Sequence, residues 1–149
     1  MLVLLFTIGA ERFGLDASEI VEVAPYVEFL PSSQPHDFVS GEFSYRGTHT
    51  PVIDLGLLTG QSACPPLLST RIILVRRASP KCPDRIIGLL AEKVTETVTI
   101  TPAQLNTSTA QELDEAAFKT PLNLDNYGTV QLLHLDRLLP SVVLDMVLS

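Results

Sequence analysis

Cysteine and histidine are the residue types in this chain that could carry nucleophilic chemistry. The sequence contains two cysteines and three histidines: Cys64, Cys82, His36, His49 and His134. A cysteine hydrolase needs a thiolate beside an imidazole that a third group orients. Both cysteines adjoin proline in probable loops and the histidines are scattered, so we predict that none of them is catalytic. A small β-barrel enzyme that uses Cys64 or Cys82 with a histidine is the less favoured alternative.

The same residue types do not indicate a metal or cofactor site. No pair of cysteines or histidines has the short spacing that is typical of zinc ligands. The eight glycines are isolated, so the sequence has no glycine-rich loop of the kind that holds phosphates. We therefore predict a protein without catalytic residues, metal or cofactor.

Two charged residues, Glu22 and Arg46, lie in otherwise apolar β-type segments. One interpretation is a partly buried ion pair that joins two strands, so that removal of one partner would cost about 3–5 kcal/mol. The other is a polar contact with a protein partner, because arginine is a favoured interface residue. Both interpretations stay open.

The surroundings of Arg46 favour a docking surface. Arg46-Gly47 separates two β-type runs and predicts a tight turn, since glycine tolerates a positive φ. Pro51 cannot donate to a β-ladder and is expected at a strand edge or a bulge. An exposed apolar groove, flanked by Ile20, Val23 and Val94, would complete such a docking site.

The composition describes a folded, acidic chain. Its 149 residues are 46% hydrophobic and 18% charged, which permits a core without metals or disulfides. The net charge of −7 repels nucleic acid and anionic lipid, so we predict neither nucleic acid binding nor direct membrane insertion. The apolar residues 1–6 are too few for a signal peptide or a membrane span. With only two cysteines, the reducing cytoplasm is the expected location.

Short runs rich in Val, Ile, Leu and Thr predict a mainly β fold with short helices. The candidate strands are residues 2–8, 20–23, 41–45, 49–53, 71–75, 86–91, 94–100 and 129–135. The candidate helices are residues 35–39, 101–105 and 141–148, where proline lies at or before the start. Residues 61–69 and 106–117 have the composition of surface loops.

The chain also contains a weak internal repeat. Residues 13–23 match residues 87–97 at an offset of 74 (Gly14 to Gly88), which places Glu22 on Glu96. Residues 51–55 match residues 133–137 at an offset of 82 (Asp54 to Asp136). Two matches in the same order favour two similar β subdomains, and short strands with frequent turns indicate small barrels.

Ordered motifs give the chain a resemblance to a known family. Ile20-Val21-Glu22-Val23 is similar to a V-x-E-I strand, and residues 41–47 are similar to a G-x-x-N-L-R-G segment. Pro51-Val52-Ile53-Asp54-Leu55 is similar to the P-V-I-D-L strand that follows it, and residues 87–94 and 100–105 fit a second half. In this order, the motifs resemble the CheW family of chemotaxis coupling proteins from residue 2 to about residue 139.

The resemblance implies two SH3-like five-stranded β-barrel subdomains packed around a shared core. They would form a single CheW-like domain over residues 1–149, divided near residues 61–70. It also implies a non-catalytic adaptor that couples the cytoplasmic tip of a chemoreceptor to the regulatory domain of a CheA-type histidine kinase.

The resemblance also implies a receptor-binding region and a structural turn and strand motif. The receptor-binding region would include Ile20, Glu22, Val23, Gly41, Arg46 and Gly47. The structural motif would include Pro51 and Asp54. The kinase-facing residues are not assigned, although the first barrel is the favoured host.

The chain departs from the family pattern in ways that leave its partners open. Ser44-Tyr45 stands where the family has Asn-Leu, and Ala24 stands where a basic residue is common. One alternative is therefore a CheW-like scaffold in a non-flagellar pathway, such as surface sensing, pili or second-messenger control. Another is a small-molecule sensor with a ligand in the cleft between the barrels.

Overall fold

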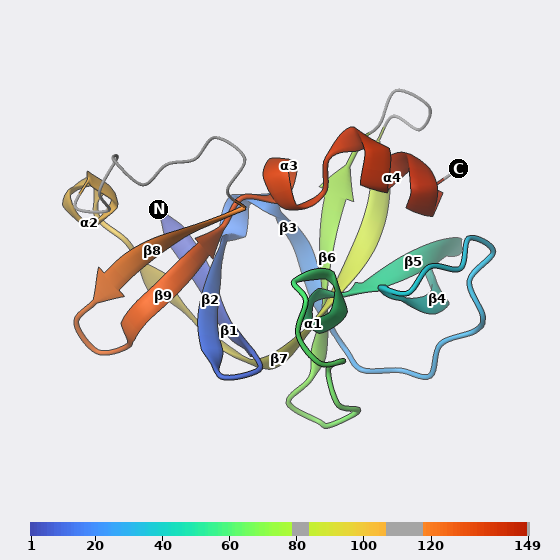
Figure 1. The fold of residues 1–149 in the computed structure, drawn as a ribbon, viewed down its shortest axis with the longest axis horizontal. Coiled ribbons are helices and arrows are strands. Elements are labelled where there is room, and N and C mark those ends of the chain that lie inside the picture. Colours follow the sequence, from blue (N-terminus) through green and yellow to red (C-terminus); the bar gives the residue numbers. More distant parts are fainter. Residues whose placement is uncertain (79–83, 107–117, 149) are drawn as a thin grey trace.

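The computed structural model describes residues 1–78, 84–106 and 118–148, and it is built mainly from β-strands (Figure 1). The strands are β1 (Leu2–Ile8), β2 (Glu11–Asp16), β3 (Ile20–Pro25), β4 (Val39–Tyr45), β5 (Thr48–Asp54), β6 (Arg71–Arg77), β7 (Arg85–Thr99), β8 (Lys119–Leu124) and β9 (Gly128–Leu133). The helices are α1 (Leu55–Leu58), α2 (Pro102–Asn106), α3 (Leu135–Leu138) and α4 (Ser141–Leu148), with a 3-10 turn η1 (Ala17–Glu19). The predicted fold class, mainly β with short helices, is confirmed.

The strands form two groups that share the long strand β7. In subdomain I, β3 pairs with β6, β6 with the first part of β7, β7 with β5, and β5 with β4. In subdomain II, the later part of β7 pairs with β1, β1 with β2, β2 with β9, and β9 with β8. Figure 1 shows subdomain II at the left, subdomain I at the right and β7 in yellow between them. Each subdomain thus has the five strands of the predicted SH3-like barrel.

The chain starts and ends in subdomain II and passes through subdomain I once in between. β1 and β2 belong to subdomain II, β3 to β6 and the start of β7 to subdomain I, and the end of β7 with β8 and β9 to subdomain II. The first half of the sequence therefore supplies strands to both subdomains, and so does the second half. Subdomain II therefore needs strands from both ends of the chain to close, whereas the strands of subdomain I follow one another along the chain.

The register shows the internal repeat directly. In each subdomain, one leucine lies between a glycine and a glutamate of the repeat, which are its partners on the two neighbouring strands. In subdomain II, Leu5 pairs with Gly14 and Glu96, and in subdomain I, Leu74 pairs with Gly88 and Glu22. The predicted match of Glu22 to Glu96 is thus confirmed.

The second predicted match was wrong by two residues. Asp54 and His134 directly precede the short helices α1 and α3. The parallel pairs Val52–Gly88 and Leu132–Gly14 give the same offset of 80 residues (Asp54 to His134). The prediction aligned Asp54 with Asp136 because both are aspartates. The residue before the short helix is the equivalent position, however, and Asp136 already lies inside α3.

A shared apolar core joins the subdomains. The largest buried cluster takes Phe6 and Phe13 from subdomain II and Ile53, Ile73 and Leu89 from subdomain I. Full burial of one such side chain contributes about 1.5–3 kcal/mol. Phe6 and Phe13 stack with their ring centroids 6.2 Å apart. Separation of the subdomains would expose this cluster to solvent.

Several local predictions differ from the structure. The helix predicted over residues 35–39 is wrong: the segment contains a turn, and the Phe38 carbonyl accepts a hydrogen bond from the Asp54 N–H at 2.8 Å. The two strands predicted at 86–91 and 94–100 are one strand, β7, which continues through Lys93 with φ of 46°. β2, β8, α1 and α3 have no counterpart among the candidate strands and helices.

The predicted loops and the membrane prediction have partial outcomes. Residues 61–69 form a loop, while residues 107–117 lie outside the described residues. Among the helices in the described part of the chain, none has both the length and the apolar character that a bilayer crossing requires.

Asp54 is a buried polar residue that joins a strand, a helix and a loop. Its carboxylate accepts hydrogen bonds from three backbone N–H groups: Gly56 at 2.8 Å, Leu57 at 3.3 Å and Cys64 at 3.0 Å. The residue is only 2% exposed. Asp54 therefore caps α1 and also holds the start of the loop that leads to β6.

Replacing Asp54 with alanine should lower the free energy of unfolding by about 2–3 kcal/mol, because three buried N–H groups lose a charged acceptor. Urea denaturation measures this loss. Asp136→Ala is the matched control, since Asp136 is exposed in the first turn of α3, and its effect should stay within about 0.5 kcal/mol. Equal effects of the two substitutions would contradict the assigned role of Asp54.

Candidate functional site

Glu22, Tyr45 and Arg46 form a polar cluster on the surface of subdomain I, which we call the Arg46 cluster. The Tyr45 hydroxyl donates a hydrogen bond to Glu22 Oε1, and Arg46 Nη2 lies 3.3 Å from the same oxygen. The Arg46 guanidinium also lies 5.0 Å from the centroid of the Tyr45 ring, in cation–π geometry. The hydrogen bond to Glu22 raises the pKa of Tyr45, because it stabilises the protonated phenol.

A two-residue turn presents Arg46 to solvent. The β4–β5 ladder extends to the pair Tyr45–Thr48, which leaves Arg46 and Gly47 as the connection. Both have positive φ, 50° for Arg46 and 80° for Gly47, as a type I′ hairpin turn requires. The predicted tight turn is therefore confirmed. Arginine is strained in this region of φ, and such strain is concentrated at functional sites.

The ion pair of the Arg46 cluster is exposed. The side chains of Arg46 and Glu22 are 65% and 46% accessible to solvent. Exposed pairs contribute at most about 1 kcal/mol to stability. The predicted ion pair between Glu22 and Arg46 is therefore present, but it is exposed and not partly buried. Arg46 has five N–H donors, and within the part of the chain that the structure describes, Nη2 alone donates a hydrogen bond.

A cavity of about 240 Å³ adjoins the Arg46 cluster between the β4–β5 hairpin and strands β6 and β7. Three arginines line it: Arg46, Arg76 and Arg85. Arg76 Nη1 lies 2.9 Å from Asp84 Oδ1. This local excess of positive charge stands out on a chain with a net charge of −7. The surface is therefore electrostatically complementary to acidic groups.

The apolar groove predicted beside Arg46 is absent from this part of the structure. Ile20 and Val23 are half-buried and pack against the main core, and Val94 is buried within it. The prediction was wrong because these side chains pack into the apolar core that joins the two subdomains. The sequence pattern alone does not distinguish such a core position from an exposed groove.

The remaining predicted site residues also separate into surface and interior positions. Glu22, Arg46 and Gly47 lie together at the surface. Gly41 is buried in β4, where an added Cβ would lie 2.5 Å from the Leu30 carbonyl oxygen, so the glycine permits a close backbone approach. Pro51 lies in β5 opposite Glu42, one residue before the stretch that pairs with β7.

Tyr45 is a member of the Arg46 cluster that the sequence prediction missed. The available signal was its departure from the family pattern, since a tyrosine stands beside the arginine where the family has leucine. Its contact with Glu22 joins strands that are distant in sequence, so only the fold could reveal it.

The candidate nucleophile Cys64 is buried. Its thiol donates to the Leu90 carbonyl oxygen at 3.4 Å. Burial, reinforced by the nearby Asp54 carboxylate, raises the pKa of Cys64 to about 12, so the reactive thiolate is scarce at neutral pH. Cys82 lies outside the described residues.

Each histidine has its own partner away from Cys64. His36 Nε2 lies 3.2 Å from the Met146 carbonyl oxygen, His49 Nδ1 lies 3.3 Å from Glu42, and His134 Nε2 lies 2.7 Å from the Thr120 hydroxyl. Within residues 1–78, 84–106 and 118–148, no group of three His, Cys, Asp or Glu side chains could hold a metal ion.

Comparison with known proteins agrees with the fold and with the ordered motifs. A family model described as the CheW-like domain matches residues 2–143. The chain belongs to the CheW-like domain family. The predicted resemblance is thereby confirmed over nearly the whole chain.

Two similar proteins carry the name chemotaxis protein CheW. The one from Klebsiella aerogenes is 26% identical over 102 residues, which cover 68% of this chain and 58% of that protein. The one from Helicobacter pylori is 28% identical over 95 residues, which cover 64% of this chain and 54% of that protein. The matches therefore span little more than half the length of these relatives.

A solved structure supports the CheW-like fold independently. The crystal structure of the scaffolding protein TtCheW from Thermoanaerobacter tengcongensis has a TM-score of 0.72 to this chain at 23% identity. The superposition covers 92% of this chain and 86% of TtCheW. The two-subdomain β architecture is therefore that of a CheW-like domain.

The buried thiol gives a direct test of the catalytic alternative. In the variant Cys82→Ser, iodoacetamide at pH 8 should label Cys64 far more slowly in the folded protein than in urea, because burial and the raised pKa both suppress the thiolate. Mass spectrometry measures the labelling. Rapid labelling of Cys64 in the folded variant would restore it as a candidate nucleophile.

Proposed function

We propose that this CheW-like domain is a non-catalytic cytoplasmic adaptor that couples a chemoreceptor to a CheA-type histidine kinase. The family supports a role in such arrays, and the similar solved structure is named a scaffolding protein. In this proposal, residues 1–149 act as one unit whose halves divide near residues 61–70.

The observation that carries the proposal is the exposed Arg46 on a short hairpin. The hairpin is rigid because β5 pairs with both β4 and β7, and a preorganised surface loses little entropy on binding. The arginine fork can meet carboxylates in bidentate geometry, and arginine is enriched among the residues that dominate binding energy. We therefore place the receptor contact at Glu22, Tyr45, Arg46 and Gly47.

The adjoining arginines define the chemistry of the partner surface. Arg76 and Arg85 extend the positive potential from Arg46 towards the β6–β7 side of the cavity. An acidic segment at the receptor tip would be attracted by this potential and would lose affinity as salt increases. Individual contacts of this kind are modest, and many copies held in one array would supply avidity.

The second candidate function is a CheW-like scaffold in a non-flagellar pathway. Tyr45 favours this alternative, because it replaces the leucine of the family pattern and takes part in the Arg46 cluster. A changed side chain at the centre of a docking surface changes which partner fits.

The variant Arg46→Glu should weaken binding of the cognate receptor cytoplasmic fragment by about tenfold or more, because the loss of a charge-assisted hydrogen bond is accompanied by repulsion. Isothermal titration calorimetry measures the affinity. The fold should survive, since the ion pair is exposed.

Two matched variants distinguish a direct contact of Arg46 with the receptor from a role of Arg46 in holding Glu22. Arg71→Glu makes the same charge change on β6 at an exposed residue outside the Arg46 cluster, and binding should stay close to that of the parent. Glu22→Gln removes the charged partner of Arg46 but keeps Arg46 itself, so it should weaken receptor binding less than Arg46→Glu does. Unchanged receptor binding by folded Arg46→Glu would refute the assignment.

A further inference from the structure

Subdomain II carries a counterpart of the Arg46 cluster. Tyr127, in the connection between β8 and β9, donates its hydroxyl to Glu96 Oε2 at 3.0 Å. Glu96 is the repeat equivalent of Glu22. The Arg12 guanidinium lies 5.6 Å from the Tyr127 ring centroid, and its Nη1 donates to the Tyr127 carbonyl at 3.0 Å. The same three residue types therefore meet again, although this arginine comes from β2.

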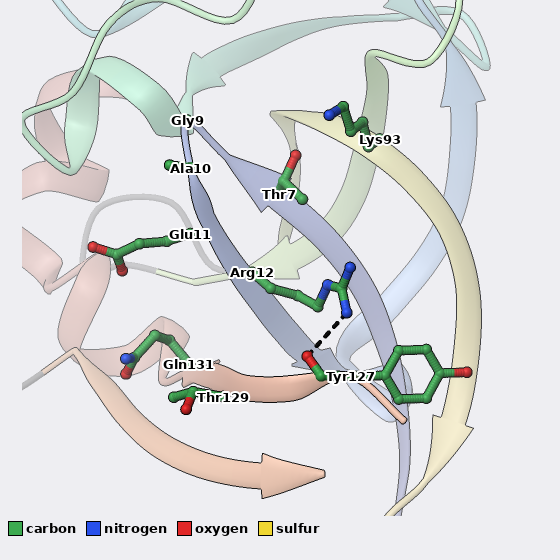
Figure 2. A pocket seen from close by; sticks show the side chains of 9 residues that line it. All are labelled: Thr7, Gly9, Ala10, Glu11, Arg12, Lys93, Tyr127, Thr129 and Gln131. Carbon is green, nitrogen blue, oxygen red and sulfur yellow. Dashed lines mark hydrogen bonds between the residues drawn. The ribbon is translucent and has the colours of Figure 1, made fainter. Parts of the chain in front are cut away.

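A polar cavity of about 520 Å³ lies beside this counterpart (Figure 2). Its walls come from the β1–β2 hairpin, from β7 and from the β8–β9 hairpin. A second cavity of about 130 Å³ adjoins it and shares four lining residues: Thr7, Arg12, Lys93 and Tyr127. The larger volume is in the range of small-molecule sites.

Two cations that line the cavity, Arg12 and Lys93, have uncommitted hydrogen-bond donors. Arg12 uses Nη1 for the Tyr127 carbonyl, which leaves other N–H groups of its guanidinium. Lys93 is exposed, and among the described residues it has neither an ion pair nor a hydrogen bond. Figure 2 shows both cations on the same side of β2, whereas Glu11 points the other way.

The carboxylates around the cavity are already engaged. Each has a donor of its own: Glu11 has Lys119 Nζ at 3.2 Å, Glu92 has the Gly9 N–H at 3.0 Å, and Glu96 has the Tyr127 hydroxyl at 3.0 Å. They therefore leave Arg12 and Lys93 without a described carboxylate partner.

Two further features mark the wall where the cavities meet. Lys93 has φ of 46° within β7, where the pairing with β1 shifts its register, and lysine adopts this conformation at an energetic cost. Thr7 Oγ1 is buried and has no hydrogen-bond partner among the described residues. Buried polar atoms are nearly always paired, so the Thr7 hydroxyl is an exception beside this wall.

We propose that this cavity binds a small organic anion between the Arg12 guanidinium and the Lys93 ammonium group. The guanidinium suits the two oxygens of a carboxylate or phosphate, and the ammonium adds a second positive charge. The Gln131 amide also lines the cavity and has N–H donors that can bond to polar groups of the ligand.

A small ligand fits this cavity better than a protein surface does. The centre of a protein interface is apolar and aromatic, whereas hydroxyl, amide and charged groups line this cavity. The site goes beyond the adaptor role and does not depend on it. It also differs from the sensor alternative of the sequence, because its lining strands are those of subdomain II.

Amide NMR titrations of the full chain test the proposal. Inorganic phosphate and citrate serve as probes at constant ionic strength, and the two arms distinguish a phosphate site from a carboxylate site. Saturable shifts are expected at Gly9, Arg12, Lys93 and Tyr127. Arg12→Gln and Lys93→Gln should each weaken binding about tenfold, as expected for the loss of one charged contact.

The control variant Arg46→Gln separates this proposal from the adaptor function. It should leave anion binding unchanged while it weakens receptor binding, and Lys93→Gln should do the reverse. Shifts that fail to saturate with either probe, or saturable binding that both Arg12→Gln and Lys93→Gln leave intact, would overturn the proposed anion site. Loss of receptor binding in Lys93→Gln would also contradict the separation of the two sites.

Discussion

The continuity of β7 is the constraint on which the rest of the structure depends. Its first part pairs with β6 and β5 in subdomain I, and its later part pairs with β1 in subdomain II. Subdomain II takes strands from both ends of the chain, with the whole of subdomain I between them, and β7 belongs to both barrels. The hairpin that carries Arg46 is paired directly to β7 through β5, and Lys93 lies within β7 itself. Both candidate sites therefore have positions fixed by the same strand.

Local chemistry made much of the fold predictable. Apolar runs rich in β-branched residues identified β1 and β6, and Arg46-Gly47 identified the hairpin turn. Predictions failed where a distant contact decides the local structure. Pro35 and Gly41 have the positions that are typical of a helix start and a helix end. The Phe38 carbonyl, however, accepts a hydrogen bond from the Asp54 N–H and not from a following turn of helix. The polar pair Glu92-Lys93 has the composition of a strand end, yet pairing with neighbouring strands continues β7 through these residues.

The candidate site was predictable only in part, for the same reason. Arg46 and Glu22 could be selected because a charge in an apolar strand is unusual. Ile20 and Val23 have the composition of an exposed docking face as much as of a core face, and only the packing of β3 against the main core decides between them. The contact between Tyr45 and Glu22 depends on how β3 and the β4–β5 hairpin lie relative to each other. Subdomain packing therefore determines which predicted residues can meet a partner.

The internal repeat explains how one architecture could support two different kinds of binding. In subdomain I, the two-residue connection after Tyr45 places arginine at the tip of the hairpin, where its donors project outward. In subdomain II, the connection after Leu124 is one residue longer, and its last residue is Tyr127. The arginine that meets this tyrosine comes from β2, and its guanidinium lies along the wall of a cavity. A projecting cation suits a broad acidic surface, whereas a cation on a concave wall suits a small anion that the wall can surround.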